Sequence, residues 1–363
     1  VSSTPSCVLA MLLLGPPAVI AGLYRIDPSW PRGLPAAAAE ISAVAVNHLA
    51  AGGAEIHVSQ RGSSLDPILV FDRAGRLLRS WGNASVSFVN DTWGSHGLNV
   101  QFADEQRFWI YDMYTGQVLV HDKNGALISK GGSTQGSALL PSLQYGNVAD
   151  GDFGLGPVAY VADGDGGCND RVIALNTTAA AGNISDPEAL LWVAGNGDGS
   201  SKHVSDPKFE SPHSLTYHRR TNTILVADRE MNRTVMLSSH GQMIGEWSCP
   251  ALGGAGGKAW GVRGTFHDED LVFVAAAESP EDGTHQFVHV LDGSHIRSDG
   301  IGPCRVLQSI PLDTSRCVTP HEMSVDAETG DMYLACVTAN ATQGNVAGLV
   351  KFARVRDEGT VVV

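Results

Sequence analysis

Short apolar runs separated by polar turns recur along most of the chain. Between residues 40 and 82, the runs ISAVAV, EIHVSQ, PILVF and RLLRSW are separated by turns that each contain glycine. Runs of this kind, bounded by turn residues and rich in Val, Ile and aromatic side chains, are typical of β-strands. The pattern therefore predicts an all-β protein made of short strands.

The same arrangement of strands and turns recurs in six consecutive units, which cover residues 40–82, 96–132, 143–197, 211–249, 257–310 and 320–356. Units of about forty to fifty residues with four short strands each are typical of a β-propeller, in which every unit forms one blade. A β-sandwich or two stacked barrels would not explain six equivalent starts. We therefore predict a six-bladed β-propeller over residues 39–359, as a single all-β domain.

An apolar segment precedes the repeats. Residues 7–24 carry no charged side chain. The prolines and small residues of this segment favour a cleaved secretory signal, with cleavage near Ala21, over a helix that stays in the bilayer. We therefore expect a signal peptide or signal-anchor at residues 1–24, a Pro-rich lead-in at residues 25–38, and no stable membrane span once the signal is removed.

Sequons and cysteines agree with a secretory route. Six N-x-[ST] sequons begin at Asn83, Asn90, Asn176, Asn183, Asn232 and Asn340, and we expect several of them to be glycosylated. Loss of Cys7 with the signal would leave five cysteines, enough for two disulfides and one free thiol. Their connectivity stays open, although Cys304 and Cys317 could close a short loop. The predicted location is outside the cell or in the lumen of the secretory pathway.

The charge excludes one class of partner. The chain has 24 Lys and Arg against 38 Asp and Glu, a formal net charge of −14. The basic residues are scattered, so no patch is available to neutralise a phosphate backbone. We expect no nucleic-acid partner.

Three histidines occupy the same local motif, in Ser95-His96-Gly97-Leu98, Pro212-His213-Ser214-Leu215 and Pro320-His321-Glu322-Met323. Each motif opens a repeat unit, and in a propeller the first strand of each blade lines the central channel. The aligned positions of the other units are Ser42, approximately Gly146, and Trp260 or Gly261. Three imidazoles from alternate blades, with one coordination position left open, predict a catalytic zinc site. A solvated channel residue is the ordinary alternative for any one of them.

Several motifs resemble NHL-type propellers and, more specifically, the peptidyl-α-hydroxyglycine α-amidating lyases. The resemblance covers residues 40–356 and rests on the three histidine motifs together with Gln60-Arg61-Gly62, Asp163-Gly164, Cys168-Asn169-Asp170-Arg171 and Ala227-Asp228-Arg229-Glu230. It implies Zn²⁺ on His96, His213 and His321. It also implies cleavage of peptides that end in α-hydroxyglycine, releasing an amidated peptide and glyoxylate. A separate copper monooxygenase would have to supply that substrate.

The resemblance implies further site residues. Arg61 and Arg229 match the two active-site arginines of the family, and a guanidinium fork suits a carboxylate. A structural Ca²⁺ would be held by the backbone carbonyls of Val46 and Leu98 and by the side chain of Glu322. The glutamate is one methylene longer than the aspartate of the family, which calcium can tolerate.

One departure affects the predicted chemistry. Gly167 stands where the family has the tyrosine proposed as the catalytic base, and glycine cannot take a proton. Asp165, in the longer loop, and Tyr114, in the neighbouring unit, are two possible replacements. The alternative function is a non-catalytic secreted propeller that binds a peptide or protein and keeps the metal as a structural element.

Overall fold

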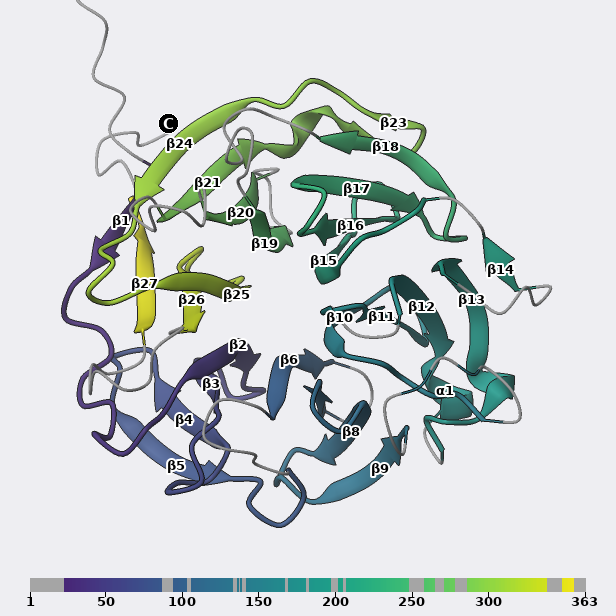
Figure 1. Cartoon of the computed structure of the whole chain (residues 1–363). Helices are drawn as coiled ribbons and strands as arrows, with labels where there is room; N and C mark the ends of the chain where they lie inside the picture. Colours follow the sequence, from purple (N-terminus) through teal and green to yellow (C-terminus); the bar gives the residue numbers. More distant parts are fainter. Residues whose placement is uncertain are drawn as a thin grey trace, which may run out of the picture.

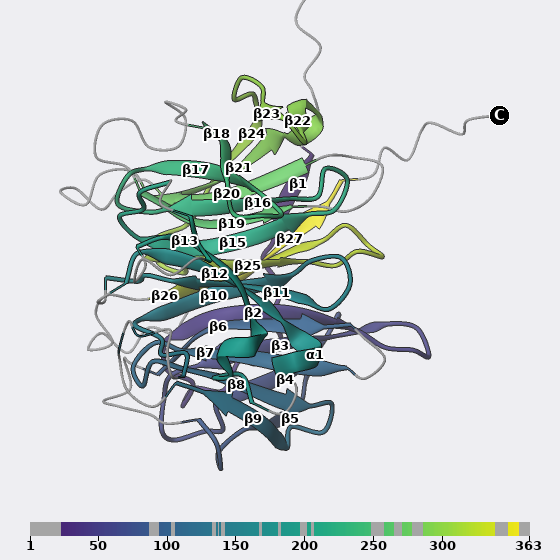
Figure 2. The ribbon, with the colours of Figure 1, turned by 90° about the vertical axis from the view of Figure 1, so that its right-hand side faces the viewer.

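Six antiparallel sheets stand around a central channel in the computed structural model (Figure 1). The side view shows the sheets in layers that pack face to face around the ring (Figure 2). The prediction of a six-bladed β-propeller is confirmed. The described residues are 23–86, 94–102, 106–132, 136, 138, 142–166, 169–180, 183–196, 202–204, 207–247, 258–264, 271–277, 286–337 and 348–355.

The first three blades follow the predicted units. From the channel outward, their strands are β2 (Ile41–His48), β3 (Ala54–Gln60), β4 (Ile68–Asp72) and β5 (Leu77–Trp81); β6 (Ser95–Gln101), β7 (Arg107–Asp112), β8 (Gln117–Asp122) and β9 (Leu127–Gly131); and β10 (Val148–Phe153), β11 (Val158–Asp163), β12 (Arg171–Asn176) and β13 (Leu190–Gly195). Blade three also carries a helix, α1 (Thr177–Ala180), and a parallel outer strand, β14 (His203–Val204). The sequence pattern did not predict these two additions.

The other three blades have the same order of strands. They are β15 (Pro212–His218), β16 (Thr223–Asp228), β17 (Arg233–Ser238) and β18 (Met243–Trp247); β19 (Lys258–Gly264), β20 (Leu271–Ala277), β21 (Gln286–Asp292) and β24 (Val306–Pro311); and β25 (Thr319–Val325), β26 (Met332–Val337), β27 (Gly348–Arg354) and β1 (Tyr24–Asp27). A small hairpin of β22 (Ile296–Arg297) and β23 (Gly300–Ile301) lies beside β18. Leu225 and Met236 are directly paired across β16 and β17.

Strand β1 closes the ring by joining the last blade. It pairs antiparallel with β27, so the beginning of the lead-in forms the outermost strand of blade six. Tyr24 is 4% exposed, its ring packs edge-on against Phe273 of blade five, and its hydroxyl donates to the carbonyl of Gly330. The ring therefore depends on contacts between the two ends of the described chain.

The core lies between neighbouring blades. One apolar cluster joins Ile56 and Phe71 of blade one to Tyr333 and Ala335 of blade six, and similar clusters fill the other junctions. Because a central strand is covered on both faces, its residues are buried in a continuous run, as in β16. This packing fixes the inner strands, which carry the candidate site.

The inner strand of every blade has an irregularity at the same place. The antiparallel register shifts at Ser42, His96, Ala149, His213, Trp260 and His321, with Glu322 also inside the last shift. A β-bulge changes the direction of a side chain and recurs near functional sites. The alignment from sequence was wrong in blade three, where the equivalent residue is Ala149 and not Gly146.

A disulfide joins Cys317 to Cys336, with the two Cα atoms 5.1 Å apart. The predicted pairing of Cys304 with Cys317 is therefore wrong. Cys304 is also disulfide-bonded, but to a cysteine other than Cys317. Cys336 lies in β26 and Cys317 just precedes β25, so the bond ties the loop that enters blade six to its second strand. Closing a loop of 19 residues stabilises the fold mainly by restricting the unfolded chain.

Some predictions fall on residues that the structure does not describe. The apolar segment up to residue 22, Gly167, and the sequons at Asn90 and Asn340 lie outside the described residues. Within the described residues, none of the helices is long and apolar enough to cross a membrane. Of the other sequons, Asn83 and Asn183 are exposed.

Candidate metal centre

Three imidazoles converge at the end of the channel where the inner strands begin. The ring centroids of His96 and His321 are 4.3 Å apart, and each lies 4.7 Å from the centroid of His213. One ring nitrogen from each histidine lies within 4.8 Å of the other two. All three side chains are buried, with exposed fractions of 0–2%. The structure thus brings together the three residues that the repeat pattern predicted as metal ligands.

Backbone carbonyls of the next blade orient two of the rings. The Nδ1 atom of His96 lies 2.8 Å from the carbonyl oxygen of Ala149, and Nδ1 of His321 lies 2.6 Å from that of Ser42. Both acceptors occupy the equivalent bulge of the following blade. Because a carbonyl only accepts, Nδ1 of each ring carries a proton, and Nε2 is the ring atom that faces the cluster. This is the arrangement found around metal-bound histidines.

Glycine permits the close approach of neighbouring bulges. A Cβ atom on Gly97 would lie 2.3 Å from the carbonyl oxygen of Ala149, and one on Gly261 would lie 2.3 Å from that of His321. Any larger side chain would push the inner strands apart. Gly97 and Gly261 therefore allow the inner strands of neighbouring blades to pack closely at the site.

The electrostatic surroundings favour a neutral imidazole at His321. Burial lowers the pKa of His321 well below its usual value, and the neighbouring His96 and His213 lower this pKa further. A neutral imidazole is the form that binds a metal ion. The donor set of three nitrogen ligands suits Zn²⁺ and other late transition metals better than Ca²⁺ or Mg²⁺.

Asp165 lies against the open side of the cluster. Its carboxylate oxygens are 3.1 Å from Nε2 of His96 and 4.0 Å from Nε2 of His213, and one accepts a 2.6 Å hydrogen bond from Arg229. Burial alone would raise the pKa of Asp165. The imidazoles of His213 and His96 and the Arg229 guanidinium outweigh burial and hold this pKa well below its usual range. Of the two candidate bases, Asp165 and Tyr114, Asp165 is the one that lies beside the histidines.

Tyr114 lies in the turn after β7. Its side chain is 46% exposed, and its backbone N–H donates to the Asp112 carboxylate. No contact in the described residues places the phenol of Tyr114 at the histidines. The structure therefore favours Asp165 over Tyr114 as the group that could replace the missing tyrosine.

The two arginines follow equivalent strands on opposite sides of the channel. Arg61 follows β3, donates to Glu40 over 2.9 Å and to the carbonyl oxygen of Ser95 over 3.1 Å, and is 6% exposed. Arg229 follows β16 and donates to Asp165 and Glu230. These contacts hold both guanidinium groups in fixed positions. The contact with Ser95, the residue before His96, places the Arg61 guanidinium next to the cluster.

The predicted calcium ligands lie farther down the channel wall. Val46 and Leu98 are on β2 and β6, which are adjacent inner strands. Glu322 is 2% exposed, and its Oε2 accepts from Ser214 over 3.3 Å. Its Oε1 and the Oδ1 atom of Asp150 are buried and have no hydrogen-bond partner among the described residues. Orphaned carboxylate oxygens fit a hard cation such as Ca²⁺.

Sequence reasoning missed two members of this buried group. Asp150 on β10 accepts from Ser214 and from the backbone N–H of Leu215, and Arg263 on β19 lies 3.4 Å from Asp150 and 3.7 Å from Glu322. Burial, followed by the Asp150 charge, raises the pKa of Glu322 well above its usual range. Both Asp150 and Arg263 could have been predicted from the sequence, because each is a charged residue within a predicted inner strand.

A second group with metal-like spacing has a different explanation. His48, Asp326 and Glu328 place ligand atoms within 4.8 Å of one another. Arg73 donates to both carboxylates, over 2.6–2.9 Å. The guanidinium already supplies the positive charge, so this group is an ion-pair network between blades one and six.

The comparisons with known proteins agree with the fold. Mouse NHL repeat-containing protein 3 is 31% identical over 335 residues, which cover 88% of this chain and 83% of the mouse protein. The human protein of the same name is 30% identical with the same coverage. The chain belongs to the NHL repeat-containing protein 3 family. The prediction of an NHL-type propeller is thereby confirmed.

More distant comparisons of this NHL repeat protein support the fold alone. A streptogramin B lyase structure superposes with a TM-score of 0.51 at 11% identity, covering 92% of this chain and 98% of the lyase. Regucalcin from Agrobacterium tumefaciens, a calcium-binding protein, superposes with a TM-score of 0.51 at 10% identity, covering 92% and 95%. No protein-family model matches the chain.

Proposed function

We propose that the protein is a zinc-dependent lyase that cleaves peptidyl-α-hydroxyglycine to a C-terminally amidated peptide and glyoxylate. The observation that carries the proposal is the convergence of three buried imidazoles, two of them oriented by backbone carbonyls, beside Arg61 and Arg229. The resemblance of the surrounding motifs to amidating lyases supports the choice of substrate.

The cluster fits zinc, since its buried nitrogen donors lie close together and backbone carbonyls orient the second nitrogens of His96 and His321. When bound to His96, His213 and His321, zinc would supply a Lewis acid that lowers the pKa of the substrate hydroxyl. Arg229 would bind the substrate carboxylate, which is negatively charged and planar like the carboxylate of Asp165. Arg61 would stabilise the negative charge that develops as glyoxylate forms.

Asp165 is the proposed base. Once the substrate carboxylate replaces it on Arg229, Asp165 can accept the hydroxyl proton. The N–Cα bond then breaks, its electron pair passes to the amide nitrogen, and Asp165 returns the proton there. The hydroxyl carbon becomes the aldehyde carbon of glyoxylate. The reaction therefore needs no external oxidant and no added water.

The proposed setting is the secretory pathway. The Cys317–Cys336 disulfide supports an oxidising compartment, because such bonds are rare in the cytosol. The substrate carries a hydroxyl on the glycine α-carbon, so an oxidative hydroxylation must precede this step. We propose a separate copper monooxygenase as the source of substrate.

A non-catalytic function is the second candidate. It is favoured by the position of Asp165, whose carboxylate lies against two imidazoles and would make a fourth protein ligand. A metal with four protein ligands is typical of structural sites, whereas catalytic sites keep one position open. In this case zinc would tie alternate blades together, and the propeller would bind a peptide or protein without changing it.

Glyoxylate release from a peptide that ends in α-hydroxyglycine distinguishes the two functions. Zinc-loaded wild-type protein should release glyoxylate and amidated peptide in equal amounts. His213→Ala should release neither, whereas His289→Ala, a buried histidine of blade five, should remain active. Protein that contains one zinc ion per chain but releases no glyoxylate from such a peptide would exclude the lyase and favour the binding propeller.

A further inference from the structure

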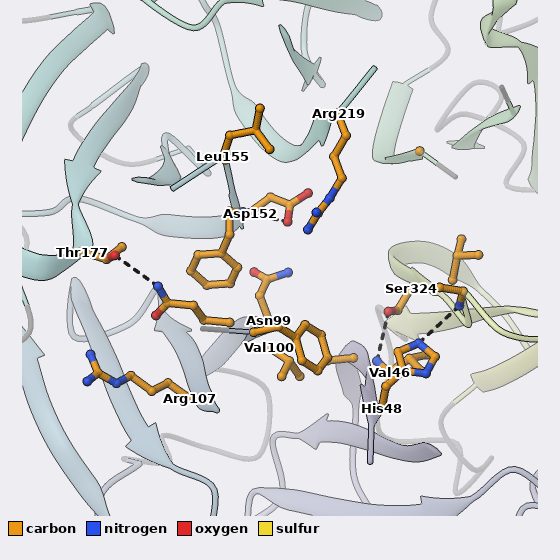
Figure 3. A pocket seen from close by; sticks show the side chains of 18 of the residues that line it. Val46, His48, Asn99, Val100, Arg107, Asp152, Leu155, Thr177, Arg219 and Ser324 are labelled. Carbon is orange, nitrogen blue, oxygen red and sulfur yellow. Dashed lines mark hydrogen bonds between the residues drawn. The ribbon is translucent and has the colours of Figure 1, made fainter. Parts of the chain in front are cut away.

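The opposite end of the channel opens into a large pocket. Its volume is about 1310 Å³, and it is lined by the last residues of inner strands, including Asn99, Asp152, Arg263 and Ser324 (Figure 3). The histidines lie near the first residues of the same strands. At about 3.3 Å per residue, the five-residue separation of His96 and Gln101 places the two ends roughly 16 Å apart. The pocket is therefore a separate site.

Positive side chains predominate in the lining. Among the described lining residues there are three arginines, Arg107, Arg219 and Arg263, and one carboxylate, Asp152. This excess stands out in a chain whose net charge is −14. Figure 3 shows Arg219 extending from the rim toward the space above Asn99. The lining favours an anion over a cation.

Asp152 does not offset this preference. One of its oxygens accepts from the backbone N–H of Phe153, and the other accepts from Tyr217 and Thr216. Arg263 also lies 3.5 Å away. The carboxylate is already engaged with the protein, so it is a poor acceptor for a cationic ligand.

The floor offers an acceptor that the protein does not use. Asn99 is 7% exposed, and its side chain points into the pocket (Figure 3). Its Oδ1 atom is buried and has no hydrogen-bond partner among the described residues. Gln101, two residues further, is by contrast held by Trp109 and Thr177. A buried amide oxygen without a partner is unfavourable unless a ligand or water donates to it.

The walls provide apolar surface. Leu155 is 60% exposed and Phe102 is 54% exposed at the pocket, and Phe153 also contributes to the lining. Exposed apolar side chains grouped around a polar floor are typical of binding sites for small organic molecules. The ligand should therefore combine an apolar body with a charged end.

We propose that this pocket binds a small organic carboxylate that has an apolar body and an N–H donor, the chemistry of an N-acylated amino acid or a peptide C-terminus. The carboxylate lies at Arg219, the N–H donates to Asn99 Oδ1, and the apolar body packs against Phe153 and Leu155. This site is independent of the histidine cluster and of the lyase reaction.

Calorimetric titration with N-acetyl-phenylalanine and with a tripeptide ending in phenylalanine tests the proposal. Wild-type protein should bind both, and should bind the uncharged N-acetyl-phenylalaninamide at least about tenfold more weakly. Arg219→Gln should remove that preference, and Asn99→Leu should weaken binding of both carboxylates by about tenfold. Tighter binding of the tripeptide would identify a peptide terminus as the ligand form, and tighter binding of the acylated amino acid would identify the free form.

One variant and added zinc control for other sites. Arg297→Gln removes an exposed arginine elsewhere and should bind as the wild type does. Saturating zinc should also leave the affinity for both probes unchanged, since the cluster is at the other end of the channel. An affinity that changes with zinc, binding that is unaffected by Arg219→Gln, or no saturable binding up to the solubility limit of the probes would each overturn the proposal.

Discussion

The chain buries two groups of histidines to the same extent and in different surroundings. The channel histidines, His96, His213 and His321, are 0–2% exposed. The blade histidines, His57, His121 and His289, are 0–4% exposed and lie on the second or third strand of their blades among other side chains. The ring of His57 lies 4.4 Å from that of Phe108, His121 binds the Ser85 hydroxyl, and His289 binds that of Ser309. Burial alone therefore does not identify a ligand.

What separates the two groups is the backbone. Each channel histidine occupies a bulge, and two of them bind the carbonyl of the equivalent bulge in the next blade. The blade histidines have direct partners in the strand ladders, although the β8–β9 register shifts beside His121, and they point toward separate neighbours. A repeated bulge gives six equivalent inward positions, and histidine at alternate ones makes a cluster.

Loss of a channel histidine should have the largest effect. His321→Ala should reduce the zinc content from one per chain to nearly none, because two ligands cannot hold the ion. His289→Ala, an equally buried histidine, should keep a full complement. Elemental analysis of dialysed protein provides the measurement. Equal zinc content in the two variants would show that His321 is no more a zinc ligand than His289 is.

Asp165 should have the next largest effect on turnover. If it is the base, Asp165→Asn should lower kcat by about 10²–10⁴-fold while leaving the zinc content intact. Tyr114→Phe is the matched control, and its glyoxylate release should be close to that of the wild type. A loss confined to Tyr114→Phe would reverse the assignment, and full activity in both variants would require a base that is not an amino-acid side chain.

Arg229→Ala should weaken transition-state stabilisation by about 3 kcal/mol, measured as a fall in kcat/KM of roughly 10²-fold. The reason is that the guanidinium binds the substrate carboxylate whichever group serves as base. Arg297→Ala, at an exposed position, controls for the loss of one positive charge. An unchanged kcat/KM in Arg229→Ala would indicate that the arginine only holds Asp165.

The blade histidines should make stability depend on pH. Burial lowers the pKa of His121 and of His289 to about 4. In the unfolded chain these groups titrate near the ordinary value of about 6.5, so the unfolded state binds more protons between the two values. Stability is complete above about pH 6.5 and should fall by roughly 1–3 kcal/mol per histidine as the pH approaches 4. Urea unfolding at several pH values should show a smaller decrease for His289→Gln than for the wild type.

Calcium should have the smallest effect. Binding at Glu322 and Asp150 stabilises the folded state only, so saturating calcium should raise the melting temperature by a few degrees (roughly 3–6 °C). Glu322→Gln should lose this response and keep its zinc. Magnesium, which prefers a stricter octahedral shell, should be less effective. A melting temperature unaffected by both calcium and chelator would assign the orphaned oxygens another role.

The sequence predicted the features that repeat. Six similar units specified the blades, and one shared motif specified the three histidines, because equivalent positions in a closed ring must face the same axis. Arg61 and Arg229 follow equivalent second strands for the same reason. Their distances from the cluster required the structure.

Features that do not repeat could not be predicted in the same way. The position of Asp165 depends on the path of a loop found in one blade. Asp150 and Arg263 are 113 residues apart in sequence and meet only because the ring brings blades three and five to the same channel. The Cys317–Cys336 pairing depends on how the loop before blade six packs against β26, and the composition of the chain does not specify this packing.

The joining of β1 to β27 has a consequence for biosynthesis. The first described strand can pair only after the last blade has been synthesised, so β1 stays unpaired while more than 300 residues follow it. Until then its partner edge and the apolar surface beneath Tyr24 are open to other chains. Closure of the ring is therefore a late folding step that joins residues far apart in the sequence. The nascent protein should need chaperone protection until its two ends pair.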